Sequence, residues 1–391
     1  MNARHVLPLA FAVVAFACNS ADVARSQDGG KATMTSAHSK PLTDREKHEL
    51  RGPVRSVVEE RNSPGWTDAD GRSYPEFKSW SKTEYDREGR TAATYFRGSS
   101  GEWVTHYSYG NAGQLLRTTI QNETGKQERE TVYQYDEMDR LRSITDSRDP
   151  NNPIVFRYDA SGRRSKIAIA QPKEQPEGLG AISRTIGASF EDAGNEAPLF
   201  EGGSAVTLYD EHDRPTEIQT RTANGEIMSR TLRVYDDQGR VIEEKQIMDD
   251  PLKMIPRGDQ KKMFASGDVS AQELRDKLAE FLGGAETWSM KYTYDAQGRK
   301  SKSIQKIFNH IEMEVEMAYN QHGDVAKETN KSTTRGTPDE EHDGTGSSET
   351  IYSYEYDSYG NWTAKKSASR SLPDGTFKDA GEDLRRTIEY F

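Results

Sequence analysis

A six-residue unit, Tyr-Asp-x-x-Gly-Arg, recurs along most of this sequence of 391 residues. The four complete copies place their defining residues at Tyr85, Asp86, Gly89 and Arg90; Tyr158, Asp159, Gly162 and Arg163; Tyr235, Asp236, Gly239 and Arg240; and Tyr294, Asp295, Gly298 and Arg299. Five variant copies begin at Tyr109, Tyr135, Tyr209, Tyr319 and Tyr356. Recurrence of one short unit predicts a repeat architecture built from a single supersecondary element.

The unit reads as a β-hairpin. Aromatic residues alternate before the turn, as in Tyr107 and Tyr109, so they lie on one face of a strand. The aspartate can accept backbone N–H bonds in the turn, and the glycine supplies positive φ. Asp139 and Asp213, which replace that glycine, belong to a residue type that tolerates the same geometry. Two strands per unit predict an all-β, antiparallel hairpin array of about twenty strands, and such a sheet must curl. We expect a spiral, an open barrel or a half-shell, with one inserted helix.

This repeated unit resembles the YD repeat, also called the RHS repeat, and the resemblance covers residues 78–391. Membership of that family implies a hollow β-shell. In some relatives the shell encloses a toxin, in teneurins it belongs to an adhesion receptor, and carbohydrate binding is ascribed to others. The final residues, Thr387 to Phe391, read as a last strand rather than as a toxin domain.

The composition agrees with a thin sheet that has much of each face exposed to water. Only 33% of residues are hydrophobic and 30% are charged, whereas the 18 Tyr, 12 Phe and 5 Trp are too many for a disordered chain. The net charge of −11, with both signs spread along the chain, argues against a nucleic-acid partner.

The N-terminus predicts export. Residues 1–17 read as a signal peptide, because residues 6–17 form an apolar run too short to span a bilayer. Cys18, the single cysteine, follows it in a position that resembles a lipoprotein lipidation site. Lipidation would anchor the protein in the outer membrane of the cell envelope, with the lipid anchor as its only membrane contact. Cleavage by an ordinary signal peptidase would instead leave the protein periplasmic or secreted. Residues 18–42 read as a flexible tether.

Four further segments flank or interrupt the repeats. Residues 43–77 are expected to hold a cap helix, begun by Thr43 and Glu46, and a first strand that protects the sheet edge. The inserts are residues 171–203, a loop with a degraded repeat; 249–286; and 331–349, a polar loop. In the second insert, Ser270 with Glu273 and the apolar stripe Leu274, Leu278, Phe281 and Leu282 predict a helix that covers core rather than one that binds a partner.

No motif for catalysis, cofactor or metal binding is present in the sequence, so we expect no catalytic, cofactor or metal residue, and Cys18 as the modified residue. The stretches 68–71 and 339–343 read as a turn and an acidic loop rather than as cation sites. The repeat tyrosines could stack on sugar rings or pack against one another across strands. The packing reading is favoured.

The prediction is a non-enzymatic, membrane-anchored YD-repeat binding or scaffold protein of the bacterial envelope, whose partner is a glycan or an envelope protein. The alternative is an accessory or partial shell of an RHS-type toxin or contact system, and the third reading is a glycan-active enzyme. The sequence leaves open the ligand, the closure of the sheet and the oligomeric state.

Overall fold

The computed structural model describes residues 42–391 apart from 64, 68–70, 99–100, 170–202, 223, 249, 251, 253–263, 265–269, 283–284, 309 and 335–343. Its dominant feature is one antiparallel sheet of 20 strands. The strands are β1 (Val54–Ser63), β4 (Phe77–Tyr85), β5 (Thr91–Gly98), β6 (Gly101–Tyr109), β7 (Leu115–Asn122), β8 (Gln127–Tyr135), β9 (Leu141–Asp146), β10 (Asp149–Tyr158), β11 (Arg164–Ile169), β12 (Ser204–Tyr209), β13 (Pro215–Arg221), β14 (Ile227–Tyr235), β15 (Val241–Ile247), β16 (Glu286–Tyr294), β17 (Lys300–Ile307), β18 (Ile311–Tyr319), β19 (Val325–Thr334), β20 (Gly344–Tyr356), β21 (Trp362–Ser371) and β22 (Lys378–Tyr390). A separate pair, β2 (Trp66–Thr67) and β3 (Ser73–Tyr74), and the helices α2 (Asp44–Lys47) and α4 (Ala271–Leu282) complete the described elements.

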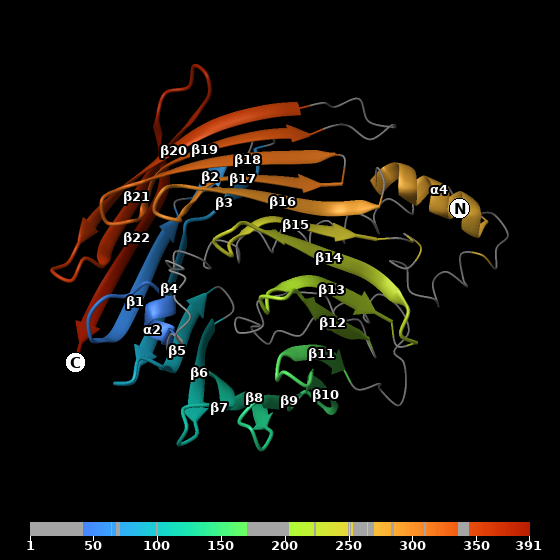
Figure 1. Ribbon diagram of the computed structural model, residues 1–391. Helices are drawn as coiled ribbons and strands as arrows, with labels where there is room; N and C mark the ends of the chain where they lie inside the picture. The colour runs from blue at the N-terminus through green and yellow to red at the C-terminus, as the bar shows by residue number, and fades with distance from the viewer. Residues whose placement is uncertain are drawn as a thin grey trace.

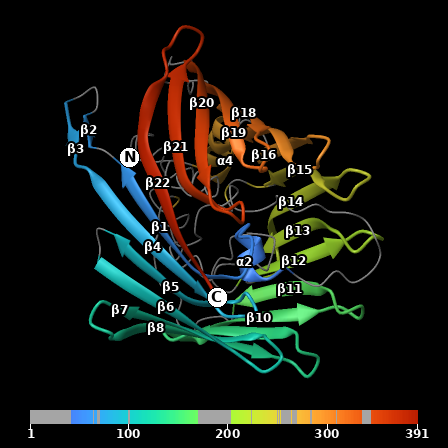
Figure 2. The same ribbon diagram turned by 90° about the vertical axis from the view of Figure 1, so that its left-hand side faces the viewer.

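The sheet closes on itself, so the expectation of a spiral, an open barrel or a half-shell is wrong. Each strand pairs with its sequence neighbour, and β1 pairs antiparallel with both β4 and β22, which completes the ring (Figures 1 and 2). Val57 lies opposite Ile388 at this seam, and the Phe391 N–H donates to the Pro53 carbonyl at 2.9 Å. The first strand therefore does not shield a sheet edge; it removes the edge by pairing with the last strand. Closure of this kind satisfies the backbone groups that an open edge would leave unpaired.

The antiparallel all-β part of the prediction agrees with the structure. The motif turns join consecutive strands at one end of the barrel, and each of them needs a left-handed residue. Gly239 has φ +78°, and Asp139 and Asp213 adopt φ 58° and 61° at the equivalent position. Glycine reaches this region without a Cβ penalty, and aspartate is among the few other residues that reach it readily.

The third insert is shorter than predicted. Residues 331–349 were expected to form a loop, but β19 continues to Thr334 and β20 begins at Gly344. These strand ends are rich in Ser and Thr, which fit a half-exposed strand, and hydrogen bonding to adjacent strands decides the conformation of such a polar run. The insert's remaining residues, 335–343, lie outside the described part of the chain.

Among the described residues, buried apolar side chains form three small clusters. Leu50, Val54, Val57 and Tyr85 are buried together at the seam, with Ile388 and Tyr390 against them. Ile144, Ile154, Phe156 and Ile167 form a second cluster across β9, β10 and β11. A third joins Leu274 of α4 to Leu252. The single wall of strands thus depends largely on contacts within the sheet.

Helix α4 lies at the end of the barrel away from the motif turns (Figure 1). The Ser270 hydroxyl accepts the Glu273 N–H at 3.1 Å, as in a helix N-cap. Leu278 packs near the buried Leu274, while the side chains of Phe281 and Leu282 lie outside the described set. Within the described part of the chain, no helix is long and apolar enough to cross a membrane.

Candidate functional site

Each motif aspartate organises its own turn. Asp236 Oδ1 accepts the backbone N–H groups of Gln238 and Arg240, both at 2.9 Å, and Oδ2 accepts Nε of Arg240 at 2.8 Å. The same contacts are made by Asp136, Asp159, Asp210 and Asp295. The carboxylate therefore fixes both the turn and the direction of the arginine.

The arginine held in this way covers the tyrosine ring of the next repeat. Distances from the guanidinium carbon to the ring centroid are 4.8 Å for Arg90 over Tyr109, 4.5 Å for Arg140 over Tyr158, 4.9 Å for Arg163 over Tyr209, 4.8 Å for Arg214 over Tyr235, 4.4 Å for Arg240 over Tyr294 and 4.3 Å for Arg299 over Tyr319. A guanidinium at this distance from an aromatic face is attracted by the ring quadrupole. The motif thus links neighbouring hairpins as well as shaping one turn.

The tyrosine hydroxyl completes the link. The Tyr294 hydroxyl donates to the carbonyl of Val241, the residue that follows Arg240, at 2.6 Å. Equivalent bonds run from Tyr135 to Leu115, Tyr158 to Leu141, Tyr209 to Arg164, Tyr235 to Pro215 and Tyr319 to Lys300. We call this chain of aspartate, arginine and next-repeat tyrosine the motif ladder. Across-strand packing of the tyrosines on one another, the reading favoured from sequence, is thus replaced in these repeats by packing on arginine.

At Tyr158, Tyr209 and Asp159, the pKa shifts of the motif ladder do not suit proton transfer at neutral pH. Burial raises the pKa of the Tyr158 and Tyr209 hydroxyls above the usual value. The hydrogen bond from the Arg163 side chain lowers the pKa of the Asp159 carboxyl. A general acid or base works best with a pKa near the working pH, and these shifts move both groups away from it.

The face that carries the motif tyrosines is the inner face. Helix α2 lies within the ring of strands (Figure 2), and its neighbour His48 is hydrogen bonded to the Tyr85 hydroxyl at 2.6 Å. The Tyr109 hydroxyl also contacts Asp44 of this helix, at 3.4 Å. Since ring face and hydroxyl are both engaged, the motif tyrosines are poor candidates for stacking on a ligand.

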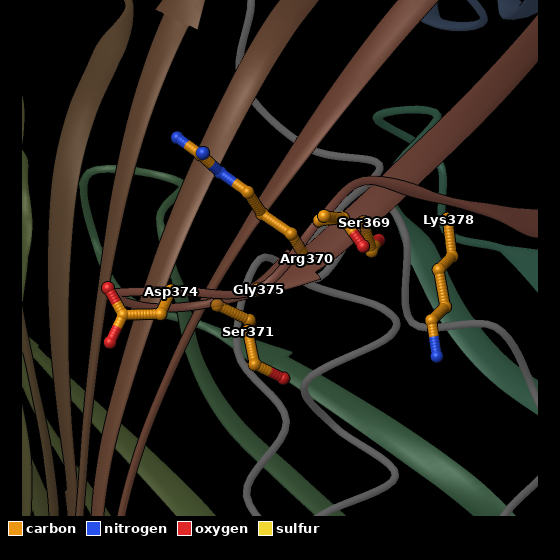
Figure 3. Close-up of a pocket in the computed structure, with 8 residues that line it drawn as sticks. Ser369, Arg370, Ser371, Asp374, Gly375 and Lys378 are labelled. Carbon is orange, nitrogen blue, oxygen red and sulfur yellow. The ribbon is translucent and has the colours of Figure 1, made fainter.

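A polar depression of about 500 Å³ lies where β21 turns into β22, at the end of the barrel away from the motif turns (Figure 3). We call it the hydroxyl pocket. Its lining residues are Ser348, Ser369, Arg370, Ser371, Asp374, Gly375, Thr376 and Lys378. Hydroxyl, carboxylate and ammonium groups together offer both donors and acceptors to a bound molecule.

The walls of the hydroxyl pocket are fixed by internal contacts. Arg370 points away from Ser371 in Figure 3 and donates to Glu349 at 2.8 Å. Its guanidinium also lies 4.6 Å from the ring centroid of Phe377, a residue that is 39% exposed. The hydrogen bond from Lys327 and that from Arg370 lower the pKa of the Glu349 carboxyl, whose own burial opposes the shift.

Sequence reasoning missed this pocket. It interpreted residues 331–349 only as a loop. The available signal was the concentration of serine on two segments that prove to be adjacent strands, with Ser348 opposite Ser371. Pairing of those segments could not be read from either one alone.

Several predicted sites lie outside the described residues. These are the signal peptide, Cys18, the tether up to residue 41, the acidic stretch 339–343, residues 68–70 of the turn, and residues 171–202 of the first insert. In the part of the chain that is described, no group of three or more His, Cys, Asp or Glu side chains could hold a metal ion.

Comparisons with known proteins do not assign a family. No family model and no curated protein matches this chain. Among solved structures, TcdB2-TccC3 without its hypervariable C-terminal region is similar over 81% of this chain, with 13% identity and a TM-score of 0.36, and this chain spans only 16% of its length. A porin-like protein from Bacteroides uniformis is similar over 87% of this chain and 98% of its own, with 10% identity and a TM-score of 0.32.

Proposed function

We propose that the protein is an exported, non-enzymatic barrel of the bacterial cell envelope that binds carbohydrate in the hydroxyl pocket. The observation that carries the proposal is the lining of that pocket. Ser348, Ser371 and Thr376 line it together with Asp374 and Lys378, while the Ser369 hydroxyl is hydrogen bonded to that of Thr350 at 2.9 Å. Sugars are held by such donor and acceptor groups, which together replace the water around their own hydroxyls.

A partly exposed aromatic ring beside the pocket adds to this argument. Phe377 lies between two lining residues, Thr376 and Lys378, and is held by the guanidinium of Arg370. A ring fixed in this manner offers an apolar face at little cost in side-chain entropy. Polar groups with one adjacent aromatic suit a sugar better than an apolar ligand.

The non-enzymatic part of the proposal rests on the use of the repeat residues. The motif aspartates are the carboxylates that recur regularly along the chain. Asp159 and Asp236, for example, accept backbone N–H groups and an arginine side chain within their own turns. A pair of carboxylates for glycoside hydrolysis needs one member with a raised pKa, whereas the pKa of Asp159 is lowered by its arginine.

Glycan binding is tested on an array with the chain from residue 42 to 391. We expect saturable binding to at least one glycan, and Asp374→Ala with Lys378→Ala to weaken it by tenfold or more, since each change removes a charged hydrogen-bonding group. The matched control is Lys306→Ala, which removes a lysine of β17 that pairs with Glu312 of β18. This change should leave binding unchanged. Equal binding by all variants would place the ligand elsewhere, and no binding to any glycan would refute the carbohydrate proposal.

The proposed location depends on Cys18. A diacylated cysteine at the mature N-terminus would attach the barrel to the outer membrane through residues 18–42, without a spanning segment. We expect Cys18→Ser to move the protein from the membrane fraction to the soluble envelope fraction. Ser20→Ala, two residues away, should not change the distribution. Identical fractionation of the Cys18→Ser variant and the native chain would exclude the lipid anchor.

A further inference from the structure

The segment that precedes β1, residues 42–53, crosses the seam where the two ends of the sheet meet. It runs from the first motif turn, at residues 86–90, to the last two, at residues 320–324 and 357–361. Figure 2 places it inside the ring, beside the C-terminal end of β22. The segment therefore touches both ends of the repeat array, which the β1–β22 pairing and the contact of Arg87 with the Phe391 ring also join.

On the side of the first repeat, helix α2 is bound by backbone groups. The Arg45 N–H donates to the Gly89 carbonyl at 3.0 Å, and the Thr91 N–H donates to the Asp44 carboxylate at 2.8 Å. Thr43 begins the helix with a capping box. Leu50, 8% exposed, then packs against Tyr85 in the seam cluster.

On the side of the last repeats, Arg51 makes the contacts. Its backbone N–H donates to Asn361 Oδ1 at 2.7 Å, and its carbonyl accepts Nδ2 of Asn361 at 2.9 Å. Its guanidinium donates to the carbonyls of Gly360 at 3.0 Å and His322 at 2.8 Å. Gly360 has φ +82°, a left-handed conformation that favours glycine, and a Cβ there would lie 2.7 Å from the Arg51 guanidinium.

The turns that receive Arg51 are two of the three that lack the motif arginine, and the third carries Gln114 at that position. Asp324 and Asn361 occupy the arginine positions of the last two repeats. In its absence the motif ladder is altered, because the Tyr356 hydroxyl donates to Asp324 at 2.6 Å and the Tyr390 hydroxyl donates to Asp357. Two neighbouring turns thus carry carboxylates, and the Arg51 guanidinium donates to the backbone carbonyls of both turns.

We propose that residues 42–53 are a clasp that holds the barrel closed, and that Arg51 stands in for the arginines that the last two motif turns lack. The clasp links the N-terminal tether directly to the seam. A force or a partner protein that displaces the first residues of the clasp acts first on the β1–β22 pairing. The seam is therefore the place where the closed ring opens.

Hydrogen exchange of the full chain, followed by mass spectrometry, tests the clasp. We expect Arg51→Ala to speed amide exchange in β22 and in residues 357–361 by tenfold or more, with β12, β13 and β14 unchanged, because local openings report local stability. Arg142→Ala, which removes an exposed arginine on β9, is the control. Equal exchange in β22 of the Arg51→Ala variant and the native chain would overturn the proposal.

A rescue experiment separates the role of the guanidinium from that of the segment. Asn361→Arg, made in the Arg51→Ala background, completes the motif after Asp357 and should restore slow exchange in β22. Asn361→Arg alone removes the two side-chain bonds to the Arg51 backbone and the bond from Asn361 Nδ2 to the Tyr390 hydroxyl of β22. It should speed exchange in residues 44–52 and, to a smaller extent than Arg51→Ala, in β22. No rescue by the double variant would refute the replacement of the motif arginine. If Arg51→Ala does not fold, Arg51→Lys carries the same test, with a smaller increase expected.

Discussion

Tyr85→Ala is expected to lower the free energy of unfolding by about 3–4 kcal/mol, the largest single effect in this barrel. Tyr85 is 4% exposed and packs with Leu50, Val54 and Val57 in the cluster that joins the clasp to β1 and β4. Removing the ring leaves a cavity where two distant parts of the chain meet.

The control for this prediction is Tyr85→Phe, measured beside it by urea denaturation. Phenylalanine keeps the ring and loses only the hydrogen bond to His48 Nδ1, so about 1 kcal/mol is expected. Burial raises the pKa of the Tyr85 hydroxyl, which keeps it protonated across the usual pH range. Equal losses in the two variants would mean that the hydroxyl, and not the packing of the ring, stabilises the seam.

The local half of this architecture could be predicted from the sequence. The turn role of Asp236 and the positive φ of Gly239 depend on atoms within five residues, and such short-range chemistry is visible in one copy of the motif. Repetition then made the hairpin array a strong prediction. The function of Arg240 was not visible, since its stacking partner, Tyr294, lies beyond the second insert.

Closure and the pocket were missed for the same physical reason. Whether twenty strands spiral or form a ring depends on the pairing of β1 with β22, for which Arg55 and Glu389 meet across 334 positions of sequence. A small change in mean twist per strand would separate these ends. The sequence contains the signs of closure, an early strand and the absence of arginine from the last two motif turns, but they become meaningful only once Arg51 is placed beside Asn361.

Asp236→Ala is expected to cost about 2 kcal/mol, the second large effect. The side chain accepts three hydrogen bonds and directs Arg240 onto Tyr294, so its loss frees the turn and one step of the motif ladder together. Bonds to a charged acceptor contribute more than neutral ones, but this carboxylate is 20% exposed, which reduces its contribution. Asp237→Ala, at the exposed next position, is the matched control and should change stability by less than about 0.5 kcal/mol.

The pH dependence of that difference identifies its origin. Burial alone would raise the pKa of the Asp236 carboxyl, but the backbone and side-chain bonds from Arg240 outweigh it and lower the pKa below the usual 3.8. A lowered pKa in the folded state stabilises the fold fully above the unfolded value, and this contribution is lost as the pH falls through the folded value. The gap between the native chain and Asp236→Ala should therefore be constant from pH 6 to about pH 5 and should shrink below about pH 4. A gap that stays the same down to pH 3 would mean that the ionised carboxylate does not hold the turn and that steric packing does.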